Sequence, residues 1–164
     1  MSVRRRSYEP GHSPKFLVVI DDTAECDRAL YFAGRRSLRT GASVLMLHVI
    51  EMHDRNQQWL GVADIMRAEA HEQANAALDR AGARATAITG VGPERVIREG
   101  EKAEEILQLI EEDEDIALLI LAAGTGTEGP GPLVASLAKT AGTFPIPVAI
   151  VPGHLSDEDL DSMS

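Results

Sequence analysis

The glycine-rich stretch AAGTGTEGPGP, at residues 122–132, is the part of this chain most suited to binding a ligand. It holds four glycines and two prolines and follows the apolar run IALLIL directly. A glycine-rich turn that leaves a buried strand can present backbone amides to phosphate, because glycine has no Cβ and accepts positive φ. Residues 124–127 would form such an amide nest, with two threonine hydroxyls beside it. The stretch therefore predicts a phosphate-binding turn, or else a plain corner between a strand and a helix.

Other residues in the same stretch oppose phosphate binding. Pro130 and Pro132 have no amide hydrogen to donate, and Glu128 adds a negative charge. No lysine or arginine occurs between residues 103 and 138. We therefore expect a site that is placed for phosphate but holds it weakly.

A second group of polar residues follows the apolar run FLVVI at 16–20, namely Asp21, Asp22 and Thr23. In an open α/β sheet, ligands bind beyond the carboxyl ends of the strands, where the strand order reverses. If the two strands are neighbours, Asp21 and the glycine stretch flank one crevice. Asp21 then either contacts a ligand or caps the next helix together with Asp22 and Thr23.

Residues for covalent or metal chemistry are few. Cys26 is the single cysteine, so no intramolecular disulfide forms, and we expect a buried, inert thiol. The histidines lack the spacing of metal ligands, and no Walker-type lysine follows the glycines. We expect no catalytic residue and no metal site.

Continuous apolar runs predict strands that are buried on both faces, at 16–20, 43–50, 116–123 and 147–152. A fifth strand, bent or split, is expected from the short pieces 85–88 and 94–97. Helical periodicity fills the intervals, at about 23–41, 62–82, 102–113 and 133–143. This alternation predicts a single-domain α/β fold with a doubly wound five-stranded parallel sheet and helices on both faces.

Length and charge narrow the classes of protein further. The 164 residues suit one domain, with a flexible N-terminal arm at 1–14, a domain at 15–153 and a loosely ordered acidic tail at 154–164. The formal net charge of −10 argues against nucleic acid as a partner. No apolar run approaches the length of a membrane span, and the single cysteine suits a reducing cytoplasm, where we expect the protein.

Four segments in order resemble the universal stress proteins, a family of the adenine nucleotide alpha-hydrolase-like superfamily. They are FLVVIDDTAECDRAL, LHVIE, REGEKAEEILQLIEEDEDIALLILAAG and FPIPVAIVPG, and they span about Phe16 to Gly153. The resemblance implies the strand order 3-2-1-4-5, with strands numbered along the chain.

The resemblance also implies a site for ATP or another adenine nucleotide. Family members that bind ATP carry a glycine, two residues, a second glycine, about nine residues and then Gly-Ser. Here Ala123 and Gly126 take the first two positions, eight residues follow, and Ala135-Ser136 stands at the end. In the alternative register Ala122 and Thr125 replace both glycines. The implied nucleotide-binding residues are Asp21, Asp22, Thr23, Val49, Ala123, Gly124, Gly126, Ala135 and Ser136.

Within that set, Asp21 is expected at the adenine or ribose end. Val49 is expected to meet adenine through its backbone, or simply to pack in the core. The expected function is that of a small stress-response binding or regulatory module with a weak ATP site.

Two alternatives remain at this point. One is an enzyme, either a weak ATP hydrolase or another nucleotide-using protein, and the other is a dimeric scaffold that binds no nucleotide. We also expect a homodimer through the last strand, at Val148, Ala149, Ile150 and Val151, unless the tail folds back over that edge.

Overall fold

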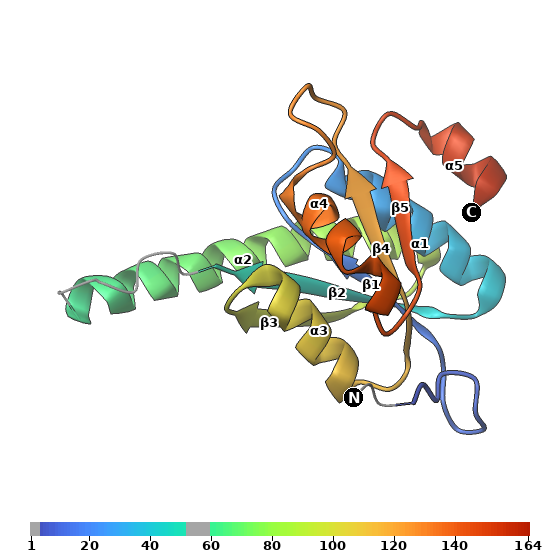
Figure 1. Cartoon of the computed structure of the whole chain (residues 1–164), viewed down its shortest axis with the longest axis horizontal. Helices are drawn as coiled ribbons and strands as arrows, with labels where there is room; N and C mark the ends of the chain where they lie inside the picture. The colour runs from blue at the N-terminus through green and yellow to red at the C-terminus, as the bar shows by residue number, and fades with distance from the viewer. Residues whose placement is uncertain (1–3, 52–59) are drawn as a thin grey trace.

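The computed structural model describes residues 4–51 and 60–164, and its centre is a parallel sheet in the order β3-β2-β1-β4-β5 (Figure 1). The predicted strand order is confirmed. The strands are β1 (Lys15–Val19), β2 (Ser43–Ile50), β3 (Glu94–Glu99), β4 (Ile116–Ala123) and β5 (Val148–Pro152). β1 is the central strand, and its Leu17 pairs with Leu45 of β2 on one side and Leu119 of β4 on the other.

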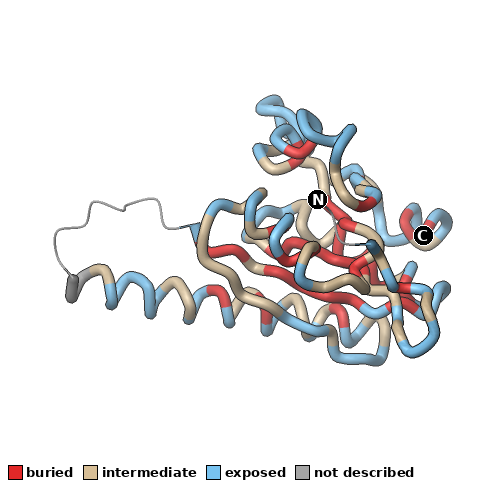
Figure 2. The backbone as a smooth tube through the Cα atoms, turned by 60° about the horizontal axis from the view of Figure 1, so that its bottom comes forward, coloured by how far each residue is buried: buried red, intermediate tan, exposed pale blue. Residues whose placement is uncertain are grey.

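Helices cover both faces of this sheet, which confirms the doubly wound architecture. They are α1 (Cys26–Thr40), α2 (Leu60–Thr89), α3 (Lys102–Glu112), α4 (Pro132–Lys139) with a 3-10 turn at Ala141–Thr143, and α5 (Asp157–Met163). α1 and α2 pack with Phe16 and Val18 on one face, and α3 and α4 pack with Leu17 and Val19 on the other. Because alternate side chains of β1 enter two different cores, the strand reads as one continuous apolar run. Figure 2 shows this buried centre between exposed helix surfaces.

The expected strand piece at 85–88 is wrong, because α2 continues through Gly82 and ends at Thr89. Ala85 packs in the same core as residues of α1 and β2. Gly90, at φ 77°, ends the helix, and its amide donates to the Thr86 carbonyl (2.8 Å). The first part of α2 extends well beyond the sheet, and residues 64–69 are exposed there (Figures 1 and 2).

The N-terminal arm, over its described residues 4–14, is held against the turn before β4. The Arg5 guanidinium donates to the carbonyls of Ile110 (2.7 Å) and Asp113 (2.9 Å) at the end of α3. The buried Ser7 hydroxyl donates to the carbonyl of Asp115 (2.9 Å). These contacts replace the flexibility that was expected of this part of the arm.

The C-terminal residues were expected to be loosely ordered, but they form α5 on the outside of α1. Leu160 is fully buried in the core, and Ser156 begins the helix with a capping box. Arg28 of α1 pairs with Asp157 (2.6 Å), and the Tyr31 hydroxyl donates to Asp161 (2.7 Å). None of the described helices is long and apolar enough to cross a membrane.

Candidate functional site

The sheet places β1 and β4 side by side and sends the chain away from them in opposite directions. β1 leads into α1 on one face, whereas β4 leads into α4 on the other. The carboxyl ends of these two strands therefore border a crevice at the point where the strand order reverses. Asp21 and the glycine stretch lie on either side of it, as the sequence predicts.

One end of the crevice, the narrow cleft, lies between the β1–α1 turn and the first turn of α4. Its lining residues are Val19, Asp21–Thr23, Glu25, Cys26, Ala29, Lys102, Leu121, Ala122 and Pro130–Val134. The other end, the wide chamber, lies along β2 and α2 and is the larger hollow. It is lined by Ile20–Asp22, His48–Glu51, Ala70, Gln73, Ala77, Arg80 and Lys102. Asp21, Asp22 and Lys102 belong to both hollows, so the two adjoin.

The three predicted polar residues after β1 all reach the crevice, but they do not cap α1. A carboxylate oxygen of Asp21 accepts hydrogen bonds from the Thr23 amide (3.0 Å) and the Thr23 hydroxyl (2.5 Å). The residue before α1 is Glu25, and its side chain makes no capping bond. The capping role considered for Asp21, Asp22 and Thr23 is therefore wrong, because the turn extends two residues past Thr23 before the helix begins.

Val49 lines the wide chamber, yet its side chain is buried in the core with α3 and α4. Only its backbone is left to meet a ligand. The neighbouring ring of His48 lies on the chamber side, with Nδ1 2.8 Å from the Ile20 carbonyl oxygen. Because a carbonyl oxygen only accepts, Nδ1 carries the hydrogen, and in that tautomer Nε2 is an acceptor.

The glycine loop, residues 124–131, uses its own amides to close on itself. The Gly124 amide donates to the Pro130 carbonyl (2.9 Å), and the Gly129 amide donates to the Gly126 carbonyl (3.2 Å). Two donors that a phosphate nest needs are thereby occupied. A Cβ added at Gly126 would have no other atom closer than 3.9 Å, so a larger residue would fit at this position.

Ala135 and Ser136, which the resemblance implies as nucleotide-binding residues, lie within α4. α4 begins three residues earlier, with Gly131 (φ 108°) before it and Pro132 as its first residue. Proline favours this position because its φ is already helical and its missing amide is not needed there. Ala135 and Ser136 follow as the fourth and fifth residues of the helix and are exposed. The first amides of α4 belong to Leu133 and Val134, and both residues line the narrow cleft.

Lys102 and Glu25 also line the crevice, and the sequence did not point to either of them. Lys102 begins α3 after a two-residue turn that follows β3, at the same edge of the sheet as the glycine loop, and is half-buried. Because Lys102 follows the carboxyl end of a parallel strand, the sequence could have predicted its position at the crevice. Glu25 lies against the glycine loop, where a Cβ added to Gly124 would stand 3.1 Å from its Oε1 atom. That contact joins segments about a hundred residues apart.

The electrostatics of the narrow cleft are acidic. Asp21, Asp22 and Glu25 line it, and Lys102 is the basic residue among its lining. Burial raises the pKa of Cys26 to about 12, and its Sγ lies 3.6 Å from the Val19 carbonyl oxygen. The thiol is therefore protonated at neutral pH, as expected of an inert cysteine. Within residues 4–51 and 60–164, no three His, Cys, Asp or Glu side chains gather as a metal site.

A model of the universal stress protein family matches residues 13–152 of this chain. The chain belongs to the universal stress protein family. No curated protein matches it.

Several solved structures share the fold of this universal stress protein. UspA from Lactobacillus plantarum is 16% identical, with 84% of this chain and 97% of that chain covered and a TM-score of 0.71. A family protein from Arabidopsis thaliana, solved with AMP bound, is 20% identical, with 88% and 94% covered and a TM-score of 0.60. The protein from Archaeoglobus fulgidus, solved with dAMP, is 18% identical, with 84% and 96% covered and a TM-score of 0.54.

Proposed function

We propose that this universal stress protein is a cytoplasmic regulatory module that binds an adenine nucleotide in its crevice. The observation that carries the proposal is the pairing of a base-sized chamber with Lys102 at the point where the strand order reverses. Two structurally similar proteins were solved with AMP or dAMP bound, which supports the same ligand class here.

The base belongs in the wide chamber. Ala70 and Ala77 offer apolar contact from α2, and the Val49 backbone offers a donor and an acceptor beside them. Nε2 of His48 adds an acceptor, which complements the exocyclic amine of adenine. Asp21, at the junction of the two hollows, is then within the region of the ribose.

The phosphate belongs at the junction with the narrow cleft. Lys102 supplies the positive charge, and the amides of Leu133 and Val134 begin α4 on the same cleft. The first turn of a helix favours an anion, because its amides are unpaired and its dipole is positive there. The glycine loop contributes little, since its Gly124 and Gly129 amides are already bonded within the loop.

The site supports binding rather than turnover. The thiol in the narrow cleft, that of Cys26, has a pKa of about 12 and is no nucleophile at neutral pH. We assign no catalytic step to the crevice. The bound nucleotide then acts as a regulatory ligand and is not a substrate.

Titration calorimetry of AMP and ATP against the wild type and Asp21→Ala tests the proposal. We expect a dissociation constant for AMP below about 1 mM, and for ATP one weaker than about 1 μM, which corresponds to roughly −8 kcal/mol. Asp21→Ala weakens AMP binding with little change in thermal stability. Absence of AMP binding at millimolar concentration would refute the nucleotide function.

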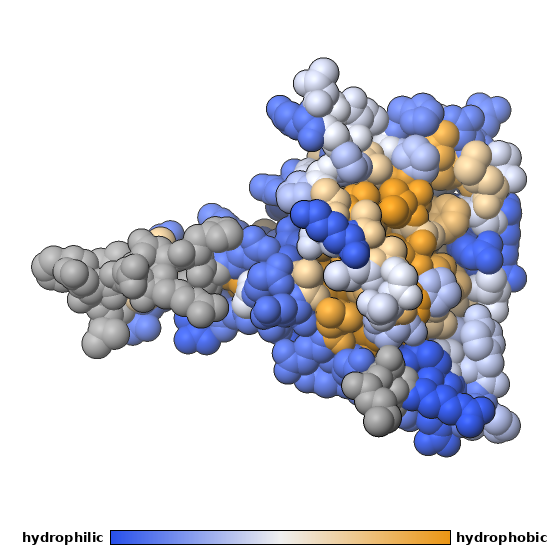
Figure 3. All heavy atoms as spheres, viewed as in Figure 1, coloured by the Kyte–Doolittle hydropathy of each residue, from blue (hydrophilic) through white to orange (hydrophobic). Residues whose placement is uncertain are grey.

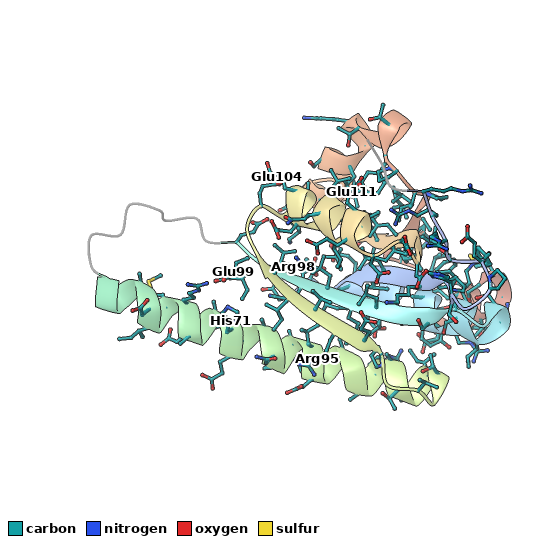
Figure 4. All side chains as sticks on the ribbon, turned by 90° about the horizontal axis from the view of Figure 1, so that it is seen from below. His71, Arg95, Arg98, Glu99, Glu104 and Glu111 are labelled. Atoms are coloured by element: carbon teal, nitrogen blue, oxygen red, sulfur yellow. The ribbon has the colours of Figure 1, made fainter. Side chains whose placement is uncertain are left out.

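We also infer a homodimer through β5. The two sheet edges differ, because each charged residue of β3 forms an ion pair with a residue of another element. The pairs are Glu94–Lys15, Arg95–Asp79, Arg98–Glu112 and Glu99–Arg67. Figure 4 shows Glu99 and His71 facing each other between β3 and α2. Charged side chains held in ion pairs protect the edge of a sheet from pairing with a strand of another chain.

The β5 edge has no such protection. Ile150 is 47% exposed, and Figure 3 shows apolar surface gathered near β5 and α4. Val151 is buried in the core and offers only its backbone to a partner. α5 packs on α1 through its ion pairs, which leaves Ile150 exposed.

Light scattering tests the dimer. We expect a mass near twice the 17.7 kDa of one chain, and Ile150→Lys lowers it toward a single chain. Leu38→Lys is the matched control, because Leu38 is equally exposed (51%) but lies on α1. A wild-type mass of one chain at micromolar concentration would exclude the dimer.

A further inference from the structure

Glu25 lines the narrow cleft, and its carboxyl group lies against the base of the glycine loop. Its Oε1 atom lies 3.1 Å, and its Cδ atom 3.6 Å, from the point where a Cβ on Gly124 would stand. A Cβ on Gly153 would stand 3.1 Å from the Cβ of Glu25. Two glycines, after β4 and after β5, thus make room for this one side chain against the base of the glycine loop.

Among residues 4–51 and 60–164, none donates a hydrogen bond to the carboxylate of Glu25 or forms an ion pair with it. It is half-buried, and Asp21 and Asp22 line the same cleft. Lys102 and the start of α4 attract a phosphate at the junction of the two hollows. Any phosphate beyond the first, if directed into the narrow cleft, approaches a half-buried negative charge there.

We propose that Glu25 sets the number of phosphates that the crevice accepts, so that the protein selects adenosine monophosphate over the triphosphate. This selection rests on the proposed nucleotide function. The mechanism is repulsion at short range between the carboxylate and the β- and γ-phosphates, in a cleft where solvent screens charges less than in bulk water. The first phosphate has Lys102 and the start of α4 as partners, and their attraction offsets the repulsion.

The test compares the dissociation constants of AMP and ATP by calorimetry, with a chelator present so that no divalent ion neutralises the triphosphate. We expect the wild type to bind AMP about tenfold more tightly than ATP. Glu25→Gln keeps the shape of the side chain and removes its charge. In this variant ATP binds about tenfold more tightly than in the wild type, whereas AMP changes less than about twofold.

Glu9→Gln is the matched control, because it makes the same change in net charge near the amino ends of the strands, beside Arg6 and away from the crevice. Glu9→Gln leaves both dissociation constants unchanged.

A second measurement uses the wild type alone. Raising the salt concentration from about 50 to 500 mM narrows the wild-type difference between AMP and ATP, because salt screens the repulsion.

The outcomes separate the two proposals. If AMP binds and Glu25→Gln leaves the ratio of the two constants unchanged, the role of Glu25 is overturned and the nucleotide function stands. A ratio that does not respond to salt also overturns the role of Glu25. If neither nucleotide binds the wild type, both proposals are overturned together.

Discussion

The two ends of the crevice share Asp21, Asp22 and Lys102 but are built for different contacts. The wide chamber has β2 and α2 as its walls and offers apolar surface, an imidazole acceptor and Arg80. The narrow cleft is bounded by Pro130 and Pro132 and has Glu25 packed against the glycine loop. The fold places a crevice at the reversal of strand order, but a few side chains in the adjoining loops decide which part of a nucleotide it accepts.

The largest expected effect concerns the close packing between the chain after β5 and the base of the glycine loop. An added Cβ at Gly153 would stand 2.5 Å from the Ala123 carbonyl oxygen, a backbone atom that already accepts the Gly153 amide (2.9 Å). Gly153→Ala therefore lowers the free energy of unfolding by about 2 kcal/mol, because backbone must move. Urea unfolding measures this.

Gly142→Ala is the control for that experiment, since a Cβ there meets nothing within 4 Å. Its effect on stability stays within about 0.5 kcal/mol. Equal stability of the two variants would contradict the close contact between Gly153 and Ala123.

The next effect separates the cation at the junction from the rest of the surface. Lys102→Ala weakens AMP binding about tenfold, or ~1.4 kcal/mol, because the phosphate loses its charged partner. Calorimetry measures the affinity, and Lys139→Ala, which removes the same charge from the end of α4, leaves it unchanged. An unchanged affinity in Lys102→Ala would place the phosphate elsewhere.

A smaller effect concerns the wall of the wide chamber. Asp27 ties α1 to α2 by accepting from Arg84 (3.0 Å), and it also pairs with Arg28 (2.6 Å). Burial alone would raise the pKa of Asp27, but the hydrogen bonds from Arg84 and Arg28 outweigh it and hold the pKa below 3.8. Since the side chain is 41% exposed and solvent screens the pairs, Asp27→Asn costs about 1 kcal/mol at pH 7.

The dependence on pH has a definite sign. A carboxyl group whose pKa is lowered by folding stabilises the protein above its ordinary pKa and loses that contribution as pH falls through the folded pKa. The stability difference between the wild type and Asp27→Asn is therefore full above pH 3.8 and shrinks below it. Thermal unfolding over this range measures it. Asp79→Asn, at a side chain 71% exposed, is the control with the smaller cost. A difference that grows on acidification would contradict this assignment.

The smallest effect is expected at Cys26, which lines the narrow cleft without charge. Because its pKa is about 12, the thiol is neutral at pH 7 and repels no phosphate. Cys26→Ser changes AMP affinity by less than about twofold, or ~0.4 kcal/mol, in the same calorimetric assay. A tenfold loss would show that the thiol takes part in binding.

The strands were predictable because a strand that is buried on both faces has an unbroken apolar sequence. The runs at 43–50 and 116–123 coincide with β2 and β4 to the residue. The piece at 85–88 misled because its local composition suits a strand, whereas its place in α2 depends on packing against α1. Gly34 makes that packing possible, since a Cβ there would stand 2.9 Å from Ile88.

The site was predictable where it follows from strand ends, as at Asp21 and Val49. The start of α4 was also predictable: the helix was expected from about residue 133 and begins at Pro132, since Gly131-Pro132 is a typical beginning of a helix. The contact of Glu25 with Gly124 joins segments distant in sequence, and no local pattern signals it. The same holds for the closure of the glycine loop by its own amides.

The most direct test of the contrast between the two ends is an AMP titration followed by the backbone amide signals in NMR spectra. We expect the largest shifts at residues 49–51 and 102, with small shifts over residues 125–129. Shifts concentrated at residues 125–129, with residues 49–51 unchanged, would show that the glycine loop holds the ligand and would contradict the proposed placement of the base in the wide chamber.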